Sequence, residues 1–229
     1  MIYLNNCSIR LGTASGSYRK AALFTRISEK NLRDYYDHWK PYKQNRLKKI
    51  PFENYPDHWH WDWNAKHSNF TGQQSTQGFA ITCRNMTQGM MFVKAPYFSK
   101  LPGAENHPLV YIEYLESAPW NIKEFTDSGI ERYRDIGTYF LCAAIWLSKR
   151  KGYGGCIGLH SLIQTESFYN KFKFVDLGND ENYSNLRYYE MTAEQASNLL
   201  NGRDLFPEQP YLMLNFAKKP LVPLKSRTA

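Results

Sequence analysis

The stretch from residue 131 to residue 174 constrains the fold most, because its pattern runs from a turn to a helix, a strand and a second helix. Thr138 to Lys151 has apolar residues at helical spacing, and the cations at Lys149 to Lys151 suit the negative end of a helix dipole. Arg132 to Gly137 forms a basic turn just before this helix. Such a turn points unpaired backbone N–H groups and the positive end of the dipole at one place, so the sequence predicts an anion site there.

The rest of this stretch supplies a strand and a second motif. Cys156 to Ser161 predicts a buried strand, and the next helix carries Phe168-Tyr169-Asn170-Lys171-Phe172-Lys173-Phe174. In order and spacing, the whole set resembles the GNAT superfamily of acyl-CoA-dependent N-acetyltransferases. That family has Arg/Gln-x-x-Gly-x-Gly/Ala at the start of the first helix and Phe-Tyr-x-x-x-Gly-Phe on the second.

Two glycines of these motifs are replaced here. In Arg132-x-x-Asp135-x-Gly137, an aspartate stands at the first glycine of the loop, and Lys173 stands at the glycine of the second motif. A carboxylate beside a pyrophosphate is unfavourable. We therefore expect the Asp135 side chain to turn away from the anion site or to pair with a neighbouring arginine.

The resemblance implies an α/β (α+β) fold in which a mixed, mostly antiparallel sheet of about six to seven strands is flanked by helices and splays to hold acyl-CoA. The residues alone predict strands at 18–25, 79–83, 90–94, 109–116, 156–161, 175–177 and 186–191. They also predict an early helix from Glu29 to Trp39, capped by Ser28 and ending before Pro41.

We expect one domain with three parts. Residues 76–191 form the acyl-CoA-binding core, and residues 1–75 add a strand, a helix and an aromatic segment on the acceptor side. Residues 192–229 add a helix, opened by the capping box from Thr192 to Gln195, and a basic extension.

The resemblance also implies where the co-substrate, acetyl-CoA, binds. In the family, the last residues of the strand at 109–116 hydrogen-bond the pantetheine arm through their backbone, and the loop before the long helix holds the pyrophosphate. No metal is expected. The cofactor-binding residues that this predicts are Leu115, Ser117, Arg132, Tyr133, Arg134, Asp135, Ile136, Gly137 and Thr138.

Acyl transfer to an amine requires an acid for the leaving thiolate and a base for the amine proton. The family often has a tyrosine hydroxyl near the sulfur, so Tyr169 is the candidate acid, with its ring free and that of Phe168 buried. Glu113 and Glu116 are the candidate bases, because burial in an apolar strand raises the pKa of a carboxylate. Their odd separation puts them on opposite faces unless a bulge intervenes, and Glu113 ranks first because it shares a face with Leu115. An ordered water or a strand histidine remains an alternative base.

Residues 57–67 have the most unusual composition, with His58, His60 and His67 among tryptophans and aspartates. A metal site is one interpretation, but the ligand set is incomplete, which favours an aromatic segment packed over the sheet. In the family, this region supplies part of the acceptor pocket. The connection from residue 118 to Arg132 is about ten residues longer than the family's and borders the site as well, so it could shape the pocket.

The net charge of +8 is unevenly distributed. Residues 1–75 carry 12 Lys/Arg and 6 Asp/Glu, residues 76–215 carry 13 and 15, and residues 216–229 carry 4 and none. The predicted core is therefore nearly neutral, which favours a small-molecule or peptide amine as acceptor over a nucleic acid. No apolar run approaches a membrane span, no secretory signal is evident, and the four cysteines lack paired spacing, so we expect a cytoplasmic protein without a membrane partner. A homodimer stays open.

Three hypotheses follow. The first is an acyltransferase that moves an acetyl or short acyl group from acetyl-CoA to a primary amine by direct attack in a ternary complex. The second is a GNAT-like module that binds CoA without catalysis, which Asp135 and Lys173 favour. The third is an acyltransferase acting on an RNA-borne amine, which the basic N-terminal region favours.

Overall fold

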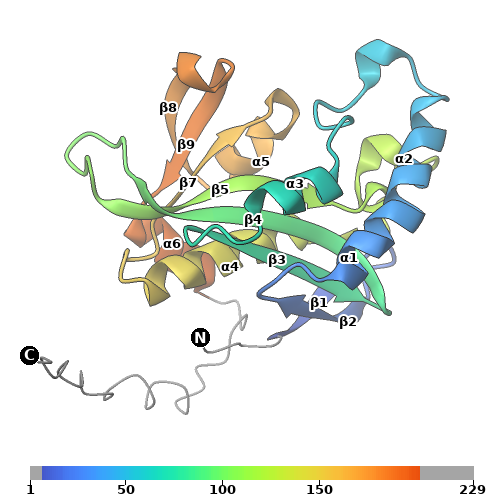
Figure 1. The fold of residues 1–229 in the computed structure, drawn as a ribbon, viewed down its shortest axis with the longest axis horizontal. Helices are drawn as coiled ribbons and strands as arrows, with labels where there is room; N and C mark the ends of the chain where they lie inside the picture. The colour runs from blue at the N-terminus through green and yellow to red at the C-terminus, as the bar shows by residue number, and fades with distance from the viewer. Residues whose placement is uncertain (1–6, 202–229) are drawn as a thin grey trace, which may run out of the picture.

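The computed structural model describes residues 7–201, in which one mixed sheet carries helices on both faces (Figure 1). Its strand order is β6-β1-β2-β3-β4-β5-β7-β9-β8. The strands are β1 (Cys7–Thr13), β2 (Tyr18–Phe24), β3 (Thr76–Cys83), β4 (Met86–Phe98), β5 (Pro108–Ser117), β6 (Tyr133–Arg134), β7 (Ile157–Ser161), β8 (Val175–Asp180) and β9 (Leu186–Met191). The α-helices are α1 (Glu29–Asp34), α2 (Lys40–Leu47), α3 (Trp63–Phe70), α4 (Ile136–Arg150), α5 (Glu166–Lys171) and α6 (Ala193–Leu200).

The predicted fold class is confirmed, but the described sheet has nine strands in place of the expected six to seven. β1 was not predicted, because only Ile9 and Leu11 mark its buried face. β6 has two residues, too few for any periodicity, and is defined by its pairing with Gly12 and Thr13 at the end of β1. Both additions extend the sheet on the side of the N-terminus.

The outer edge of β1 is covered in two places, by a short strand and by a side chain. β6 pairs with its last residues, and further along the strand the hydroxyl of Tyr139 in α4 bonds both backbone groups of Arg10. This hydroxyl accepts from the Arg10 N–H at 3.3 Å and donates to the Arg10 carbonyl at 2.5 Å. A side chain thus replaces a neighbouring strand at this position.

The two faces of the sheet bury separate cores. The face covered by α4, α5 and α6 packs Phe140 and Ala144 against strand residues such as Val93 and Val110. The opposite face, covered by the N-terminal helices and α3, is dominated by aromatic rings (Figure 1). These rings include Tyr35, Trp39, Trp63, Phe70, Phe92 and Trp120.

The first helix continues through Pro41, where the sequence predicted that it would end. Residues Tyr35–Trp39 form a π-helical turn, in which the Lys40 N–H bonds to the Tyr35 carbonyl five residues earlier. Pro41 then stands in the first turn of α2. The prediction assumed that proline ends an α-helix, because its ring clashes with the preceding turn and it lacks an N–H. It was wrong because the wider π-helical turn before Pro41 accommodates both effects.

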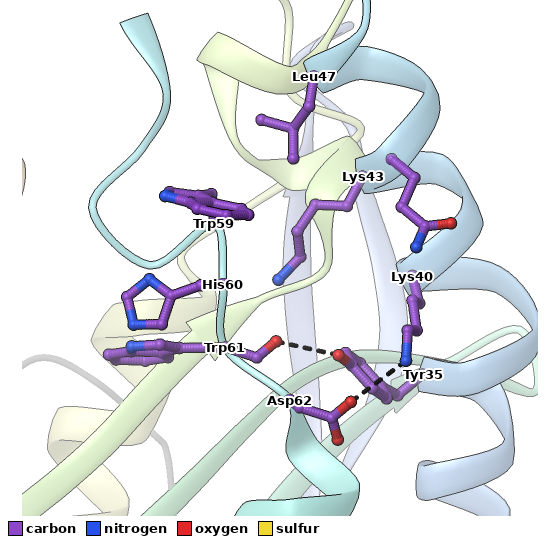
Figure 2. A pocket seen from close by; sticks show the side chains of 9 residues that line it. Tyr35, Lys40, Lys43, Leu47, Trp59, His60, Trp61 and Asp62 are labelled. Atoms are coloured by element: carbon purple, nitrogen blue, oxygen red, sulfur yellow. Dashed lines mark hydrogen bonds and ion pairs between the residues drawn. The ribbon is translucent and has the colours of Figure 1, made fainter. Parts of the chain in front are cut away.

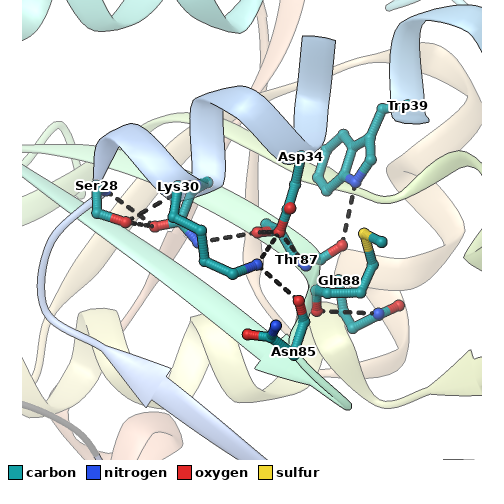
Figure 3. Close-up of polar contacts among 9 residues, drawn as sticks. Ser28, Lys30, Asp34, Trp39, Asn85, Thr87 and Gln88 are labelled. Carbon is teal, nitrogen blue, oxygen red and sulfur yellow. Dashed lines mark hydrogen bonds and ion pairs between the residues drawn. The ribbon is translucent and has the colours of Figure 1, made fainter. Parts of the chain in front are cut away.

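A buried polar network holds α1 on the start of β4 (Figure 3). One oxygen of Asp34 accepts from the Thr87 N–H at 2.8 Å and from the Thr87 hydroxyl at 2.6 Å. Asn31 donates to the same hydroxyl, and the Trp39 indole N–H donates to the Thr87 carbonyl. Because these groups satisfy one another away from water, the helical unit that carries α2 has a defined position above the sheet.

The long helix α4 begins two residues earlier than predicted and lies close to β4. A Cβ atom at Gly89 would come within 2.7 Å of Ile136 and 2.6 Å of the Phe140 ring, so only glycine allows this approach. At the other end of the core, the predicted capping box is confirmed: the Thr192 hydroxyl and the Gln195 side chain cap each other's backbone N–H groups. The predicted basic extension lies outside the described residues.

Candidate active site

The strands β5 and β7 run parallel for three residue pairs and then separate. The last of these pairs joins Ile112 to Leu159. From there to Ser117, β5 remains paired with β4 on one edge, whereas its other edge has no strand partner in the described part of the chain. This is the predicted splay. Its unpaired backbone groups, which include those of Leu115, can bond an extended ligand as an added strand would.

A bulge in β5 changes which side chains share a face. Phe92 pairs with Tyr114 and Val93 pairs with Ile112, so Glu113 has no opposite residue in β4. The alternation of the strand shifts by one residue at this point. Consequently, Tyr114 and the residue two positions later, Glu116, both face the aromatic core under α3.

The bulge corrects the expectation that the two candidate bases lie on opposite faces. Glu113 pairs with Lys94 at 2.9 Å, and the Lys94 ammonium lies over the ring of Phe70 in α3. Both carboxylates therefore face α3, while Leu115 packs against the core under α4. Glu113 therefore does not share a face with Leu115, which removes the reason for placing it before Glu116 as the candidate base.

Glu116 lies at the centre of a buried cluster. One carboxylate oxygen accepts from the Lys43 ammonium at 2.6 Å and the other from the Trp63 indole N–H at 2.5 Å. The side chains of Lys43 and Glu116 are 4% and 0% exposed. Because both oxygens are bonded, the charged carboxylate is stable in this apolar setting.

His58 lies beside this ion pair. Its Nε2 atom is 3.8 Å from Glu116 Oε1 and has no hydrogen-bond partner in the described structure. The ring packs edge-on against Trp61 and against Phe125, which belongs to the long connection before the basic turn. Burial lowers the pKa of His58, although the Glu116 carboxylate opposes this shift. The imidazole is therefore neutral near pH 7 and can accept a proton.

Residues 55–58, which we call the strap, connect the ends of the two separated strands. Gln164, which follows β7, donates to the Tyr55 carbonyl at 3.2 Å and accepts from the Asp57 N–H at 3.1 Å. His58 contacts the end of β5 through Glu116. The strap thus runs across the splay from the side of β5 to the side of β7.

A pocket of about 240 Å³ lies between the N-terminal helices and the segment that follows the strap (Figure 2). The Lys43 side chain extends across it between Trp59 and the helix, and Lys40 pairs with Asp62 at 3.3 Å. The Tyr35 hydroxyl donates to the Trp61 carbonyl at 2.9 Å. The lining residues are Tyr35, Lys40, Lys43, Gln44, Leu47, Trp59, His60, Trp61 and Asp62. Lys43 thus lines this pocket and also bonds to Glu116 near the end of β5.

Lys66 approaches the same strand from α3. Its ammonium lies 3.2 Å from the centroid of the Tyr114 ring and 4.3 Å from that of Trp61. Burial lowers the pKa of Lys66 to about 8, against the opposing effect of the two glutamates. A fraction of this amine is therefore neutral at mildly alkaline pH.

The basic turn leads into α4 as predicted. The first helical bond runs from the backbone N–H of Tyr139 to the Asp135 carbonyl. The N–H groups of Ile136, Gly137 and Thr138 come before this bond. These three groups have no hydrogen-bond partner in residues 7–201. They are therefore free to act as donors to an anion, as the sequence predicts.

The side chains of the turn have other roles. Tyr133, Ile136 and Thr138 are buried, so only their backbone can meet a ligand. Arg132 lies with its guanidinium 5.0 Å from the Trp120 ring centroid, and Arg134 approaches Glu131 at 3.7 Å. Neither arginine forms an ion pair with Asp135 among the described contacts.

Asp135 keeps the backbone conformation of a glycine. Its φ is +69°, and Lys173, at the other replaced glycine, has a φ of +57°. The Asp135 carboxylate turns toward β1, where a Cβ atom at Gly12 would lie 3.3 Å from it. The expected turning away is thus present, and the strain of the left-handed backbone remains.

We expect Asp135→Gly to raise the free energy of unfolding by about 0.5–1 kcal/mol, because glycine adopts a left-handed backbone without strain. Lys173→Gly should act in the same direction. The matched control is Lys171→Gly, two residues before Lys173 and at the end of α5. Because this residue is helical, the substitution should lower the free energy of unfolding by a similar amount. Urea unfolding measures all three, and a loss of stability in Asp135→Gly would contradict the strain argument.

Tyr169 lies in the core under α4. It is 8% exposed, and its ring packs against Phe174 and Tyr189. Phe168 is the more exposed of the two neighbouring rings and covers Gly137, where an added Cβ would come within 2.9 Å of it. The expected order, with the first ring buried and the second free, is therefore reversed. Burial raises the pKa of Tyr169, so its phenol keeps its proton throughout the neutral range.

Comparison with known proteins gives a match in structure alone. No protein-family model matches the sequence, and no curated protein does either. A crystal structure described as that of a presumed acetyltransferase matches at a TM-score of 0.52, with 12% identity over 87% of this chain and 95% of that one. The chain has the GNAT acetyltransferase fold.

Two further structures fall just below that level of similarity. The PaiA N-acetyltransferase from Thermoplasma acidophilum, in complex with coenzyme A, matches at a TM-score of 0.47, with 15% identity over 75% of this chain and 98% of that one. FeeM, an N-acyl amino acid synthase from uncultured soil microbes, matches at 0.49, with 8% identity over 79% of this chain and 96% of that one. At these identities, the likeness concerns the GNAT fold and not the substrate.

Residues 7–201 contain no group of three or more histidine, cysteine, aspartate or glutamate side chains that could hold a metal ion. None of the described helices is long and apolar enough to cross a membrane.

Sequence reasoning missed the partners of Glu116. Lys43, His58 and Trp63 come from three separate segments and meet only because α2 and α3 pack on the same face of the GNAT fold. One signal was available: a lysine in a helix whose next turn holds the apolar Leu47 lies on the buried side of that helix. Nothing in the sequence indicates which carboxylate it meets.

Proposed function

We propose that this protein is an acyltransferase that moves an acetyl or short acyl group from acetyl-CoA to a primary amine by direct attack in a ternary complex. The observation that carries the proposal is the unpaired edge of β5 in a GNAT fold, next to a helix whose first N–H groups lack partners. The edge suits an amide-bearing pantetheine arm, and the helix start suits a pyrophosphate.

In this proposal, the backbone of Leu115 and Ser117 binds the pantetheine arm. The turn from Arg132 to Thr138 binds the pyrophosphate mainly through backbone N–H groups, because several of its side chains are buried. The orientation of the Asp135 carboxylate toward β1 supports this assignment, since the carboxylate makes no capping bond to the N–H groups of α4. Acetyl-CoA supplies the activated acyl group, and the chain supplies binding and proton transfer.

Glu116 is the residue that we propose as base for the amine. Its side chain lies on the same face of the sheet as α3, and it is next to Leu115 in the part of β5 with an unpaired edge. Glu113, in contrast, is more exposed and is paired with Lys94. His58, with an unpartnered Nε2 next to Glu116, can take the proton onward. Tyr169 is proposed as the acid that protonates the leaving thiolate, since its phenol is protonated near pH 7.

The acceptor is proposed to enter through the pocket that contains Lys43. Its walls are rich in aromatic side chains, such as those of Trp59 and Tyr35, and the Lys43 that lines it bonds to Glu116. Such a pocket suits a small molecule or a peptide side chain that ends in a primary amine, because aromatic faces bind both apolar chains and ammonium groups.

Calorimetric titration of acetyl-CoA into the protein tests the proposal. We expect saturable binding that requires the pantetheine arm, so that desulfo-CoA binds and ADP binds far more weakly. Binding would then lead to a screen of primary amines, followed by detection of CoA thiol. If no short acyl-CoA were bound or consumed, the acyltransferase proposal would be abandoned.

The rival is a CoA-binding module of the same fold without catalysis. Asp135 and Lys173 favour it, because both add side chains where the family has glycine. The two proposals differ in turnover: the rival predicts acetyl-CoA binding without formation of CoA thiol in the presence of any amine.

A further inference from the structure

Lys43 places a primary amine where the proposed reaction takes place. Its ammonium donates to Glu116 Oε1 at 2.6 Å, and its side chain is 4% exposed. Glu116 belongs to the stretch of β5 that has no partner on the side of β7 in the described structure. The amine nitrogen is thus within hydrogen-bond reach of a carboxylate next to the edge proposed to bind the thioester arm.

Stability alone gives little reason for this ion pair. Removing two charges from water costs several kcal/mol, and a buried pair is often no more stabilising than apolar side chains of similar size. An amine beside a carboxylate that can take its proton is, in contrast, the arrangement of a nucleophile and its base. Lys43 also lines the pocket between the N-terminal helices and the segment after the strap.

Two other lysines near the site do not combine a buried ammonium with a direct contact to the proposed base. Lys94 pairs with Glu113, but its side chain is 36% exposed and the carboxylate lies within the bulge. Lys66 lies over aromatic rings and forms no ion pair with a carboxylate in residues 7–201. Lys43 alone among these three combines burial with a direct contact to the proposed base.

We propose that Lys43 is itself a substrate of the protein, acylated on its Nζ atom by the acyl-CoA bound at β5. This inference rests on the proposed function, since it requires acetyl-CoA to bind there. It goes beyond transfer to an external amine, because it assigns a specific modification site within the chain.

The step balances in atoms and charge. Glu116 takes a proton from the Lys43 ammonium, and the neutral amine attacks the thioester carbonyl carbon. A C–N bond forms, the C–S bond breaks, and Tyr169, the proposed acid, protonates the CoA thiolate and regains a proton from Glu116 through solvent. The amide nitrogen loses its second proton to solvent, so one acetyl-CoA and one ammonium yield one amide, one CoA thiol and one proton.

Acylation would change the site for later turnovers. The neutral amide no longer compensates the charge of Glu116, whose other bond is the one from Trp63. The carboxylate oxygen that Lys43 occupied would then be free to accept a proton from another amine. Self-acylation would thus convert a carboxylate held in an ion pair into a base available to an external amine.

The test is incubation of the purified protein with isotope-labelled acetyl-CoA, without an added amine, followed by peptide mass spectrometry. Lys48 and Lys49, which are exposed and close in sequence, report the purely chemical acetylation of surface lysines. We expect Lys43 to gain one labelled acetyl group faster than either, despite its burial. Urea-unfolded protein should show no such preference.

Variants separate this proposal from the proposed function. Lys43→Arg keeps the charge and should remove the label at this position, whereas Lys66→Arg should leave the label on Lys43. Glu116→Gln should abolish the label while acetyl-CoA still binds by calorimetry. If acetyl-CoA bound and was transferred to an external amine but Lys43 stayed unlabelled, self-acylation would be overturned and the acyltransferase would stand. If acetyl-CoA did not bind, both would fail.

Discussion

Glu116→Gln should lower kcat/KM for acyl transfer by about 10²- to 10⁴-fold, which is the usual contribution of a general base. The amide cannot take the proton of the acceptor amine, although it keeps the shape of the carboxylate and can accept from Trp63 and Lys43. The dissociation constant of acetyl-CoA should change little, because the proposed cofactor contacts are backbone groups. Steady-state kinetics and calorimetry measure the two quantities.

This variant also affects stability, which must be separated from catalysis. The substitution leaves the Lys43 ammonium buried without a counter-charge, which costs about 3–5 kcal/mol. The double variant Lys43→Met/Glu116→Gln removes both charges and should recover most of that loss while staying inactive. Transfer at the wild-type rate in a folded Glu116→Gln protein would rule out Glu116 as the base.

Glu113→Gln is the matched control within the same strand. Its partner Lys94 is 36% exposed and can be solvated when the charge is lost, so we expect a change in rate of less than about tenfold. A larger loss than that of Glu116→Gln would restore the original ranking of the two acids.

Tyr169→Phe should lower kcat by about 10²-fold or more while acetyl-CoA binding is retained, because the variant removes the proposed acid and keeps the ring. Packing against Phe174 and Tyr189 involves the ring and not the hydroxyl. The fold should therefore be preserved, and the thermal midpoint provides the check. This outcome would favour the enzyme over the module without catalysis.

Tyr189→Phe controls for the loss of a buried hydroxyl in the same core. The ring centroid of Tyr189 is 5.9 Å from that of Tyr169, and this residue has no proposed role in proton transfer. Its substitution should leave kcat close to wild type. Equal losses in both variants would mean that core packing, not the Tyr169 phenol, sustains activity.

Much of the fold could be predicted from the sequence because its signals are local. The apolar spacing from Thr138 to Lys151 predicts α4 to within two residues at its start, and the run between Pro108 and Pro119 predicts β5. The capping box at Thr192 predicts the start of α6. Each of these features depends on neighbours a few residues apart, which a sequence displays directly.

What could not be predicted depends on tertiary contacts. The bulge at Glu113 is a mismatch between two strands, so it cannot be seen in either one alone. The pairing of Glu116 with Lys43 and Trp63 spans 73 and 53 residues. The glycine conformation of Asp135 was hidden for another reason: the backbone kept its left-handed turn after the residue type had changed.

The covered edge of β1 affects how copies of this chain can associate. A sheet recruits a neighbouring molecule where a run of N–H and C=O groups lies open along an outer strand. Here Tyr139 satisfies both groups of Arg10, and β6 occupies the end of the strand. An incoming strand would have to displace the Tyr139 hydroxyl from Arg10 and break the pairing of β6 with β1 before it could form its own hydrogen bonds. Two copies of this protein are therefore not expected to associate by joining their sheets at β1.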